Sequence, residues 1–327
     1  MDAQKHLFEI VSSRISDRQR LSDVIEDLLG VHSNSAYRRI RGDTELTFSE
    51  IQKICNKFNL SIDELLNHRS TSGAVFHYNP LKLSDQDSYI SQMQRMLNIL
   101  NVLKSSSDKE IVYEARSIPF YYLVMQPGLA FLNLYIWNNT LQRLNISYEV
   151  FCGKLDKENM LSMYQKIHHA FIAIPSKEIW TVHTIGVTLR LIEYCFETGA
   201  FDKKDTVLLL LKQLSGLMDT VRQYADSGLK GGELKTPFAM YNCSIDLENN
   251  SMMAKKESRY SLFIRLHTVN FIETDNEELC NATLQWNNDL ISKSAPVSGE
   301  SSSKQRLRFF EQTKKKIEEL VHKIKTG

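Results

Sequence analysis

Apolar residues recur every three or four positions along the first 70 residues, in short runs that polar segments separate. On a helix this spacing gathers them on one side, so the pattern predicts a bundle of five short helices around a shared core. Gly30 and Gly42 each follow a run and predict the end of a helix. The apolar positions of the predicted helices are, in chain order, Leu7, Ile10, Val11, Ile15, Leu21, Val24, Ile25, Leu28, Ala36, Ile40, Ile51, Ile54, Phe58, Ile62, Leu65 and Leu66.

Polar residues mark where three of these helices begin. Ser33 is placed to cap a helix over residues 34–41. The segments TFSE (47–50) and SIDE (61–64) each place a Ser or Thr three residues before a Glu, a spacing typical of capping boxes. The polar, Gly-terminated stretch HRSTSG predicts that the bundle ends near residue 70 and that a linker covers residues 71–76.

Longer stretches with the same helical spacing follow over residues 77–235. The clearest are 176–197, which begins at a serine placed to cap it, and 204–226. Their similar apolar stripes predict an antiparallel helix pair. Further helices are expected from about residue 85 and from Pro127. The segment EIVYEARSIPFYYL stays open between strand and helix, because a proline interrupts its strand-like composition.

The pattern changes after residue 235, where FAMYNCSI, NSMMAKK and YSLFIRLHTVNFIET are rich in β-branched and aromatic residues and predict strands. Residues 303–325 return to a helical spacing, with apolar residues on one side and lysines and arginines on the other. The pattern as a whole predicts a mainly α protein with a strand-containing C-terminal part. The expected domains are a five-helix bundle over 1–70, a linker over 71–76, a helical domain over 77–235 and a mixed α/β region over 236–327.

Composition narrows the functional classes. The 327 residues are 42% hydrophobic and 24% charged, as in soluble globular proteins, and the net charge of +1 gives no overall basic field. The five cysteines are scattered without the spacing of a zinc site or a disulfide framework. No signal peptide, membrane-length apolar stretch or standard enzyme motif is evident. We therefore expect a cytoplasmic protein that makes no membrane contact and has no catalytic residues, metal or cofactor.

The stretch SNSAYRRIRG (33–42) carries the most specific chemistry. Two short helices joined by a Gly-containing turn form a helix-turn-helix, whose second helix enters the DNA major groove. Ala36 and Ile40 can face the core of the bundle, which leaves a polar outer side. Asn can bond adenine and Arg can bond guanine, so this side predicts base recognition. The predicted base-contacting residues are Asn34, Ser35, Tyr37 and Arg38, with Ser33 and Arg41 docking the helix on DNA. Arg39 is expected to point toward the DNA backbone or toward an acidic partner.

Other interpretations of the conspicuous residues compete with these functions. Arginines on a helix often form a solvated, salt-bridged face, and residues 1–70 hold eleven Asp or Glu against ten Lys or Arg. DNA binding therefore requires the acidic residues of SDVIED to face away from the groove. For His168, His169 and His183, a satisfied or surface histidine is favoured over metal binding. Core packing is favoured over a ligand pocket for PFYYL, Trp137 and Trp180. For KQRLRFFEQTKKK, a solvated amphipathic helix that packs on the core or on a partner is favoured over phosphate binding.

The segment RLSDVIEDLLGVHSNSAYRRIRGDTELTFSEIQKICNKFNLSIDELL resembles the Cro/CI-type, lambda-repressor-like helix-turn-helix domains. The likeness covers about the first fifth of the chain. It rests on Leu29-Gly30-Val31, on the ending RIRG, on Ile51 and Ile54, and on LSIDELL. Two positions depart from the family pattern: Asp23 or Val24 stands where an early Ala is usual, and Arg41 where an acidic residue is common. The blocks EIVYEARSIPFYYLVMQPGLAFLNLYIW, KEIWTVHTI and LISKSAPVSGESSSKQRLRFF also look like those of long regulators of the Bacteroidota.

The resemblance implies a sequence-specific transcriptional regulator that binds double-stranded DNA. Because one short helix contacts only a few base pairs, a homodimer on two half-sites is expected, through the helices of 177–226 or the C-terminal helix. The larger part is expected to dimerise and to sense a small-molecule or protein effector. Two alternatives stay open. One is an interaction scaffold or phage-defence component, and the other is an enzyme of unfamiliar type within residues 237–300.

Overall fold

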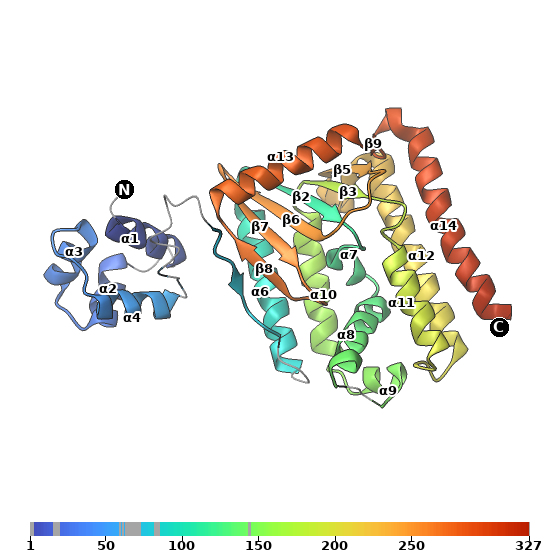
Figure 1. Ribbon diagram of the computed structural model, residues 1–327, viewed down its shortest axis with the longest axis horizontal. Helices are drawn as coiled ribbons and strands as arrows, with labels where there is room; N and C mark the ends of the chain where they lie inside the picture. Colours follow the sequence, from blue (N-terminus) through green and yellow to red (C-terminus); the bar gives the residue numbers. More distant parts are fainter. Residues whose placement is uncertain are drawn as a thin grey trace. The chain divides into compact units, whose positions relative to one another are not determined.

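The chain divides into two compact units, Met1–Val75 and Phe76–Gly327 (Figure 1). The computed structural model describes residues 3–15, 20–58, 60, 62, 73–81, 86–142 and 145–326. The expected mainly α fold, with a strand-containing C-terminal part, is confirmed. We refer to the two units as the small unit and the large unit.

The small unit is a helical bundle with its own apolar core. Its described helices are α1 (Ala3–Arg14), α2 (Leu21–Leu29), α3 (Ser33–Arg41) and α4 (Phe48–Phe58). Most of the apolar residues that the helical spacing predicts lie in this core, but the predicted Ile15 and Val24 do not. The core also contains residues that the spacing did not single out, namely Phe8, Leu29, Val31, Leu46, Cys55 and Leu60. The second capping box, with Ser61 and Glu64, and the apolar residues Leu65 and Leu66 of the fifth predicted helix lie outside the described residues.

The large unit is built on one mixed sheet whose strands come from distant parts of the chain. The main strands follow the order β1-β8-β7-β6-β2-β3-β5-β4, and β9 pairs with β5. The pairs β2–β3 and β3–β5 are parallel and the others are antiparallel. The strands are β1 (His77–Tyr78), β2 (Lys109–Ala115), β3 (Ser176–Trp180), β4 (Leu229–Lys230), β5 (Thr236–Asn242), β6 (Asn250–Lys256), β7 (Arg259–Arg265), β8 (Phe271–Thr274) and β9 (Ala295–Pro296).

Helices cover both faces of this sheet (Figure 1). Ile111 and Tyr113 of β2 lie in the main core with helices of one face, whereas Val112 between them packs toward α13 on the other. This alternation follows from the two-residue period of a strand. The helices are α6 (Gln86–Ser105), α7 (Phe120–Leu123), α8 (Pro127–Gln142), α9 (Tyr148–Gly153), α10 (Lys157–Ile172), α11 (Gly186–Glu197), α12 (Lys204–Ser227), α13 (Glu277–Lys293) and α14 (Ser303–Thr326), with short 3-10 turns at Gly232–Leu234 and Glu300–Ser302.

Most elements with strong periodicity are confirmed. Helix α12 has nearly the predicted bounds, and α8 begins at Pro127. Strands β5 and β6 overlap the predicted segments FAMYNCSI and NSMMAKK, whereas YSLFIRLHTVNFIET forms two strands, β7 and β8. The open segment EIVYEARSIPFYYL divides into β2 and α7 on the two sides of Pro119. The predicted amphipathic helix α14 is also confirmed, and of its two expected surfaces it packs on the core, to which it contributes Phe310 and Ile317.

The helix predicted from Ser176 to Glu197 is wrong in its first part. Residues Ser176–Trp180 form the central strand β3, and the helix begins only at Gly186. Ser176 does not cap a helix, because its hydroxyl donates to Glu178 Oε1 at 3.0 Å. A strand paired on both sides and covered on both faces needs no alternation of polar and apolar residues, so its sequence lacks the usual signal.

The sheet also joins regions that the sequence pattern separates. Strands β2 and β3 come from residues 77–235 and pair with β6 and β5 from residues 236–327. In the same unit, α14 packs on α11 and α12. Its apolar side is therefore covered within the chain, which leaves that side unavailable as the surface of a dimer.

Candidate nucleic-acid interface

The turn between α2 and α3 is closed by backbone geometry that the sequence anticipates. Gly30 adopts a left-handed conformation, with φ of 68°, and its N–H donates to the carbonyl of Glu26 at 2.9 Å. Glycine adopts this conformation without the penalty that a Cβ imposes. Gly42 ends α3 in the same way, with φ of 85°. The two glycines therefore fix both the entry into α3 and its length.

Helix α3 begins one residue earlier than predicted. The capping position is held by His32, whose carbonyl accepts hydrogen bonds from the N–H groups of Ser35 and Ala36 at 2.8 and 3.1 Å. Ser33 is thus the first helical residue, and the expected cap at Ser33 is wrong. The side of α3 that faces the core is nevertheless the predicted one, because Ala36 is fully buried and Ile40 packs against the same core.

Four of the six predicted DNA-contacting residues form one exposed face of α3. Asn34, Tyr37, Arg38 and Arg41 are all exposed. At about 100° of rotation per residue they fall within an arc of roughly 100° on the helix surface. Ser33 and Ser35 are partly buried, one on each side of this arc. We call the four exposed residues the α3 face. It combines an amide, a phenol and two guanidinium groups, which can all form hydrogen bonds with base edges or phosphates.

Arg39 lies outside the α3 face and pairs with an acidic partner, the second of the two roles expected for it. Its Nη2 lies 2.9 Å from Glu50 Oε1, and both side chains are largely buried. Glu50 also accepts from the Thr47 N–H at 2.9 Å, and the Glu50 N–H donates to Thr47 Oγ1 at 3.3 Å, so the predicted capping box is confirmed. Burial alone would raise the pKa of Glu50, but the hydrogen bonds from Thr47 and Arg39 outweigh burial and lower it. This pair ties α3 to the start of α4.

Gln4 of α1 also fixes the position of α3, through contacts that the sequence analysis did not predict. Its Nε2 donates to the carbonyls of Arg39 and Thr44 at 2.7 and 2.8 Å, and its Oε1 accepts from the Leu46 N–H at 2.9 Å. One amide therefore satisfies backbone groups at the end of α3 and in the loop that follows. Gln4 and Leu46 are 42 residues apart in the sequence. An isolated glutamine on a helix gives no sign in the sequence of contacts at such a distance.

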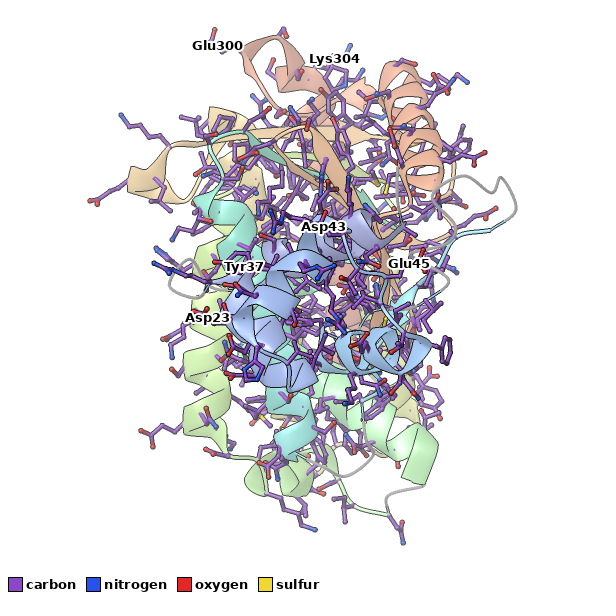
Figure 2. All side chains as sticks on the ribbon, turned by 90° about the vertical axis from the view of Figure 1, so that its left-hand side faces the viewer. Asp23, Tyr37, Asp43, Glu45, Glu300 and Lys304 are labelled. Carbon is purple, nitrogen blue, oxygen red and sulfur yellow. The ribbon has the colours of Figure 1, made fainter. Side chains whose placement is uncertain are left out.

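Tyr37 is held against α2 through a buried serine. The Ser22 hydroxyl lies 3.3 Å from the Tyr37 hydroxyl and 3.1 Å from Asp23 Oδ1. Figure 2 shows Asp23 and Tyr37 at the same edge of the small unit, with Glu45 at the other edge. The expectation that all acidic residues of SDVIED face away from the α3 face therefore does not hold for Asp23, which is exposed beside it.

The two arginines of the α3 face differ in their partners. Arg41 Nε lies 3.5 Å from Asp43 Oδ2, and both side chains are more than half exposed. Such a pair is worth little in water and can exchange for a phosphate contact. Arg38 has no ion pair among the described residues. It is therefore the cation of α3 that is most available to an external anion or base.

A second set of charged groups lies in the large unit, inside the core. Glu178 and Lys230 are both fully buried. The Glu178 carboxylate accepts from Tyr122 at 2.7 Å and from Trp180 Nε1 at 3.0 Å, and Lys230 Nζ donates to Ser176 Oγ at 2.8 Å. Ser176 donates in turn to Glu178, so the serine bridges the two charges. Because all these groups are buried, we regard the network as structural.

Lys230 makes the stability of the large unit depend on pH. Burial lowers its pKa from the ordinary 10.5 to about 8, although Glu178 opposes the change. Between pH 8 and 10.5 the unfolded chain binds more protons than the folded one, so the contribution of Lys230 to the free energy of unfolding rises with pH, by up to about 3 kcal/mol. Denaturant unfolding of the wild type and of Lys230→Met from pH 7 to 10 should show this rise in the wild type alone. Parallel curves would contradict the prediction.

The histidines noted in the sequence give no sign of a metal site. The His168 Nδ1 lies 2.9 Å from the Tyr121 carbonyl, which confirms that this residue is a satisfied histidine, as expected. Among the residues that the structure describes, no group of three or more His, Cys, Asp or Glu side chains is placed to hold a metal ion. Within the same described part of the chain, no helix has the length and apolar character needed to cross a membrane.

Comparison with known proteins gives one finding for this region. A family model described as "BetR domain" matches residues 7–100, a range that begins within α1 and extends through the rest of the small unit and β1 to most of α6. No curated protein and no solved structure gives a significant match to the chain. The BetR domain is a family of helix-turn-helix-like DNA-binding domains, so the match supports a DNA-binding regulatory role for a chain that presents the α3 face.

Proposed function

We propose that this protein is a sequence-specific, DNA-binding transcriptional regulator of the Cro/CI type, without enzymatic activity. Helix α3 enters the major groove, where Asn34 and Arg38 contact base edges. Tyr37, Arg41 and the flanking Ser33 and Ser35 complete the contacts to bases and backbone. The observation that carries this proposal is the α3 face, four exposed polar residues within one arc of a helix.

The fixed position of α3 supports base recognition over loose attraction to phosphates. The pair Arg39–Glu50 and the Gln4 amide hold the end of α3 from two different helices. Side chains on a rigid helix keep the geometry that bidentate contacts to adenine or guanine require. A flexible basic segment would supply attraction without this discrimination.

A short recognition helix contacts too few base pairs for a unique site, so we further propose that two copies bind two half-sites. The apolar side of α14 is covered by α11 and α12, so the contact between copies uses another surface. We also propose that the large unit is the part that supplies dimerisation and senses a signal.

The first test selects binding sequences from a random duplex pool with the full-length protein. We expect a palindromic motif with two half-sites. Anisotropy titration of Arg38→Ala on that motif should show a loss of about 1–3 kcal/mol and relaxed preference at one base pair of each half-site. Lys53→Ala removes an exposed cation of α4 and serves as the control, because it should leave base preference unchanged. Absence of any motif, with wild-type binding by Arg38→Ala, would contradict the proposal.

Asp23 provides a test with the opposite sign. Its exposed carboxylate beside Tyr37 repels phosphates when α3 is bound, so Asp23→Asn should tighten DNA binding several-fold at low salt. The gain should shrink as salt is raised, because the interaction is screened. Glu45 lies at the other edge of the small unit (Figure 2). Glu45→Gln should therefore have no such effect. Equal effects of the two substitutions would show that Asp23 does not face the DNA.

A further inference from the structure

The loop that follows β3 carries a group of basic side chains at the carboxyl edge of the sheet. Strand β3 lies between β2 and β5, and all three strands are parallel. Ligands of such sheets bind preferentially outside this edge, where the loops after parallel strands lie. Residues 181–185 form the loop after β3 and lead into α11 at Gly186. We call the side chains of His183, Arg190 and Lys316 the basic cluster.

Hydrogen bonds fix the backbone of this loop. The Thr184 hydroxyl donates to the Ala115 carbonyl at 2.6 Å and accepts from the Thr181 N–H at 3.0 Å. The Thr181 hydroxyl accepts in turn from the His183 N–H at 3.1 Å. Both threonines are buried. The loop is therefore tied to the end of β2 and gives His183 a rigid support, as a binding site requires.

The members of the basic cluster come from the loop, from α11 and from α14, and they meet at the loop. Lys316 Nζ donates to the Val182 carbonyl at 2.7 Å and lies 3.4 Å from His183 Nδ1. Arg190 Nη1 lies 3.4 Å from the position that a Cβ on Gly186 would take. The Arg190 guanidinium is therefore folded back over the first residue of α11, shortly after His183 in the chain.

Lys316 has no carboxylate partner. Burial is the main cause that lowers the pKa of its ammonium, and the charge of Arg190 lowers it further. Glu319 opposes this change, but its carboxylate pairs with Lys315 at 3.8 Å. The carbonyl and imidazole contacts of Lys316 use two of the three donors of an ammonium group. One donor and the whole charge are therefore left for another partner.

Arg190 has no carboxylate partner either. The two glutamates that follow it on α11, Glu193 and Glu197, both pair with Lys323 at 2.6 Å. Within the described part of the chain, the Arg190 side chain makes no ion pair and no hydrogen bond. Two like charges that converge without a carboxylate disfavour each other, and a bound anion removes this penalty.

We propose that the basic cluster binds the phosphate group of a small phosphate monoester. Such a group carries nearly two negative charges at neutral pH, which Arg190 and Lys316 balance. Its three free oxygens accept from the guanidinium, from the remaining Lys316 donor and from His183 Nε2. The histidine donor follows from the contact at Nδ1: an ammonium only donates, so Nδ1 accepts and the imidazole proton is on Nε2. A phosphodiester, with one charge and two free oxygens, fits the cluster less well.

Lys316 is the last residue of KQRLRFFEQTKKK, for which the sequence analysis ranked phosphate binding below the packing of an amphipathic helix. The two roles are compatible in the structure. Phe310 and Ile317 pack on the core, whereas Lys316 reaches the loop after β3. Phosphate binding is thus assigned to this one lysine together with groups from elsewhere in the fold, and the rest of the segment has no part in it.

Isothermal titration of the full-length protein with methyl phosphate tests the site, with dimethyl phosphate as the diester probe. Methyl phosphate should bind the wild type at least tenfold more tightly than dimethyl phosphate does. Arg190→Gln should weaken methyl phosphate binding at least tenfold. Lys314→Gln is the matched control, because it removes an exposed lysine of α14 that pairs with Glu318, and it should leave binding unchanged. Absence of methyl phosphate binding, equal binding of the diester, or unchanged binding by a folded Arg190→Gln would overturn the proposal.

A second variant protects this test against misfolding. Lys316→Gln removes the other cation and keeps a donor for the Val182 carbonyl, so it should also weaken methyl phosphate binding at least tenfold. Thermal unfolding establishes which variants are folded. If Arg190→Gln does not fold, unchanged methyl phosphate binding by a folded Lys316→Gln overturns the site.

The DNA backbone is the other source of phosphate groups, and it consists of diesters. The proposal therefore expects equal DNA affinity for the wild type and Arg190→Gln. Weaker DNA binding by Arg190→Gln, together with equal binding of the two probes, would assign the basic cluster to the DNA backbone and overturn the small-molecule site. A wild type that binds methyl phosphate but no DNA refutes the proposed function and still supports the site.

Discussion

Glu178→Gln is expected to lower the free energy of unfolding of the large unit by about 3 kcal/mol or more at pH 7. Glutamine keeps the size of the side chain and an oxygen for Tyr122 or Trp180, but it removes the negative charge. Lys230, fully buried and bridged to Glu178 through Ser176, then has no compensating carboxylate in this network. An uncompensated buried charge is one of the few single changes with so large a cost.

The measurement is denaturant unfolding of three variants beside the wild type. Glu110→Gln is the matched control, because Glu110 and Lys177 form a similar pair at 3.0 Å on β2 and β3 but are much more exposed. We expect a cost below about 1 kcal/mol there. The double variant Glu178→Gln, Lys230→Met should recover most of the stability, since it removes the isolated charge as well. A cost at Glu178 no larger than at Glu110 would refute the account of the network.

The same network shows why one part of the fold resists prediction from sequence. Elements such as α6, α12 and α14 carry an apolar stripe that packs against the core, so the local pattern determines them. Strand β3 carries Lys177 and Glu178 between a serine and an isoleucine, which looks like the capped start of a helix. Its actual environment depends on Lys230 and Tyr122, which come from other parts of the chain.

In the candidate site, too, local spacing predicts some features, whereas others depend on contacts between distant parts of the chain. The glycine-ended helices, the inward Ala36 and Ile40, and the outer polar side of α3 all follow from local spacing, and the structure agrees with them. The contacts that fix α3 in place were only half predicted. An acidic partner for Arg39 was one of two options, and Gln4 gave no signal at all. Asp23 beside Tyr37 depends on how α2 and α3 pack, which the spacing of either helix alone cannot give.

Ala36→Asp is expected to unfold the small unit and abolish DNA binding. Ala36 is fully buried, in the core that also holds Ile25 and Ile54. A carboxylate in this position loses its hydration without gaining a partner, at a cost of several kcal/mol. A bundle of this size has a total stability of only about 3–5 kcal/mol. The substitution therefore removes most or all of it. The large unit should keep its own unfolding transition, because its core is separate.

Asn34→Asp separates loss of fold from loss of contact. It introduces the same charge into the same helix, two residues away, but on the exposed α3 face. We expect it to retain wild-type helical content by circular dichroism. Its DNA affinity should fall at least tenfold, because a carboxylate replaces the amide at the groove and repels phosphates. If Ala36→Asp bound DNA like the wild type, the fully buried position of Ala36 would be wrong. If Asn34→Asp did so, α3 would not be the helix that enters the groove.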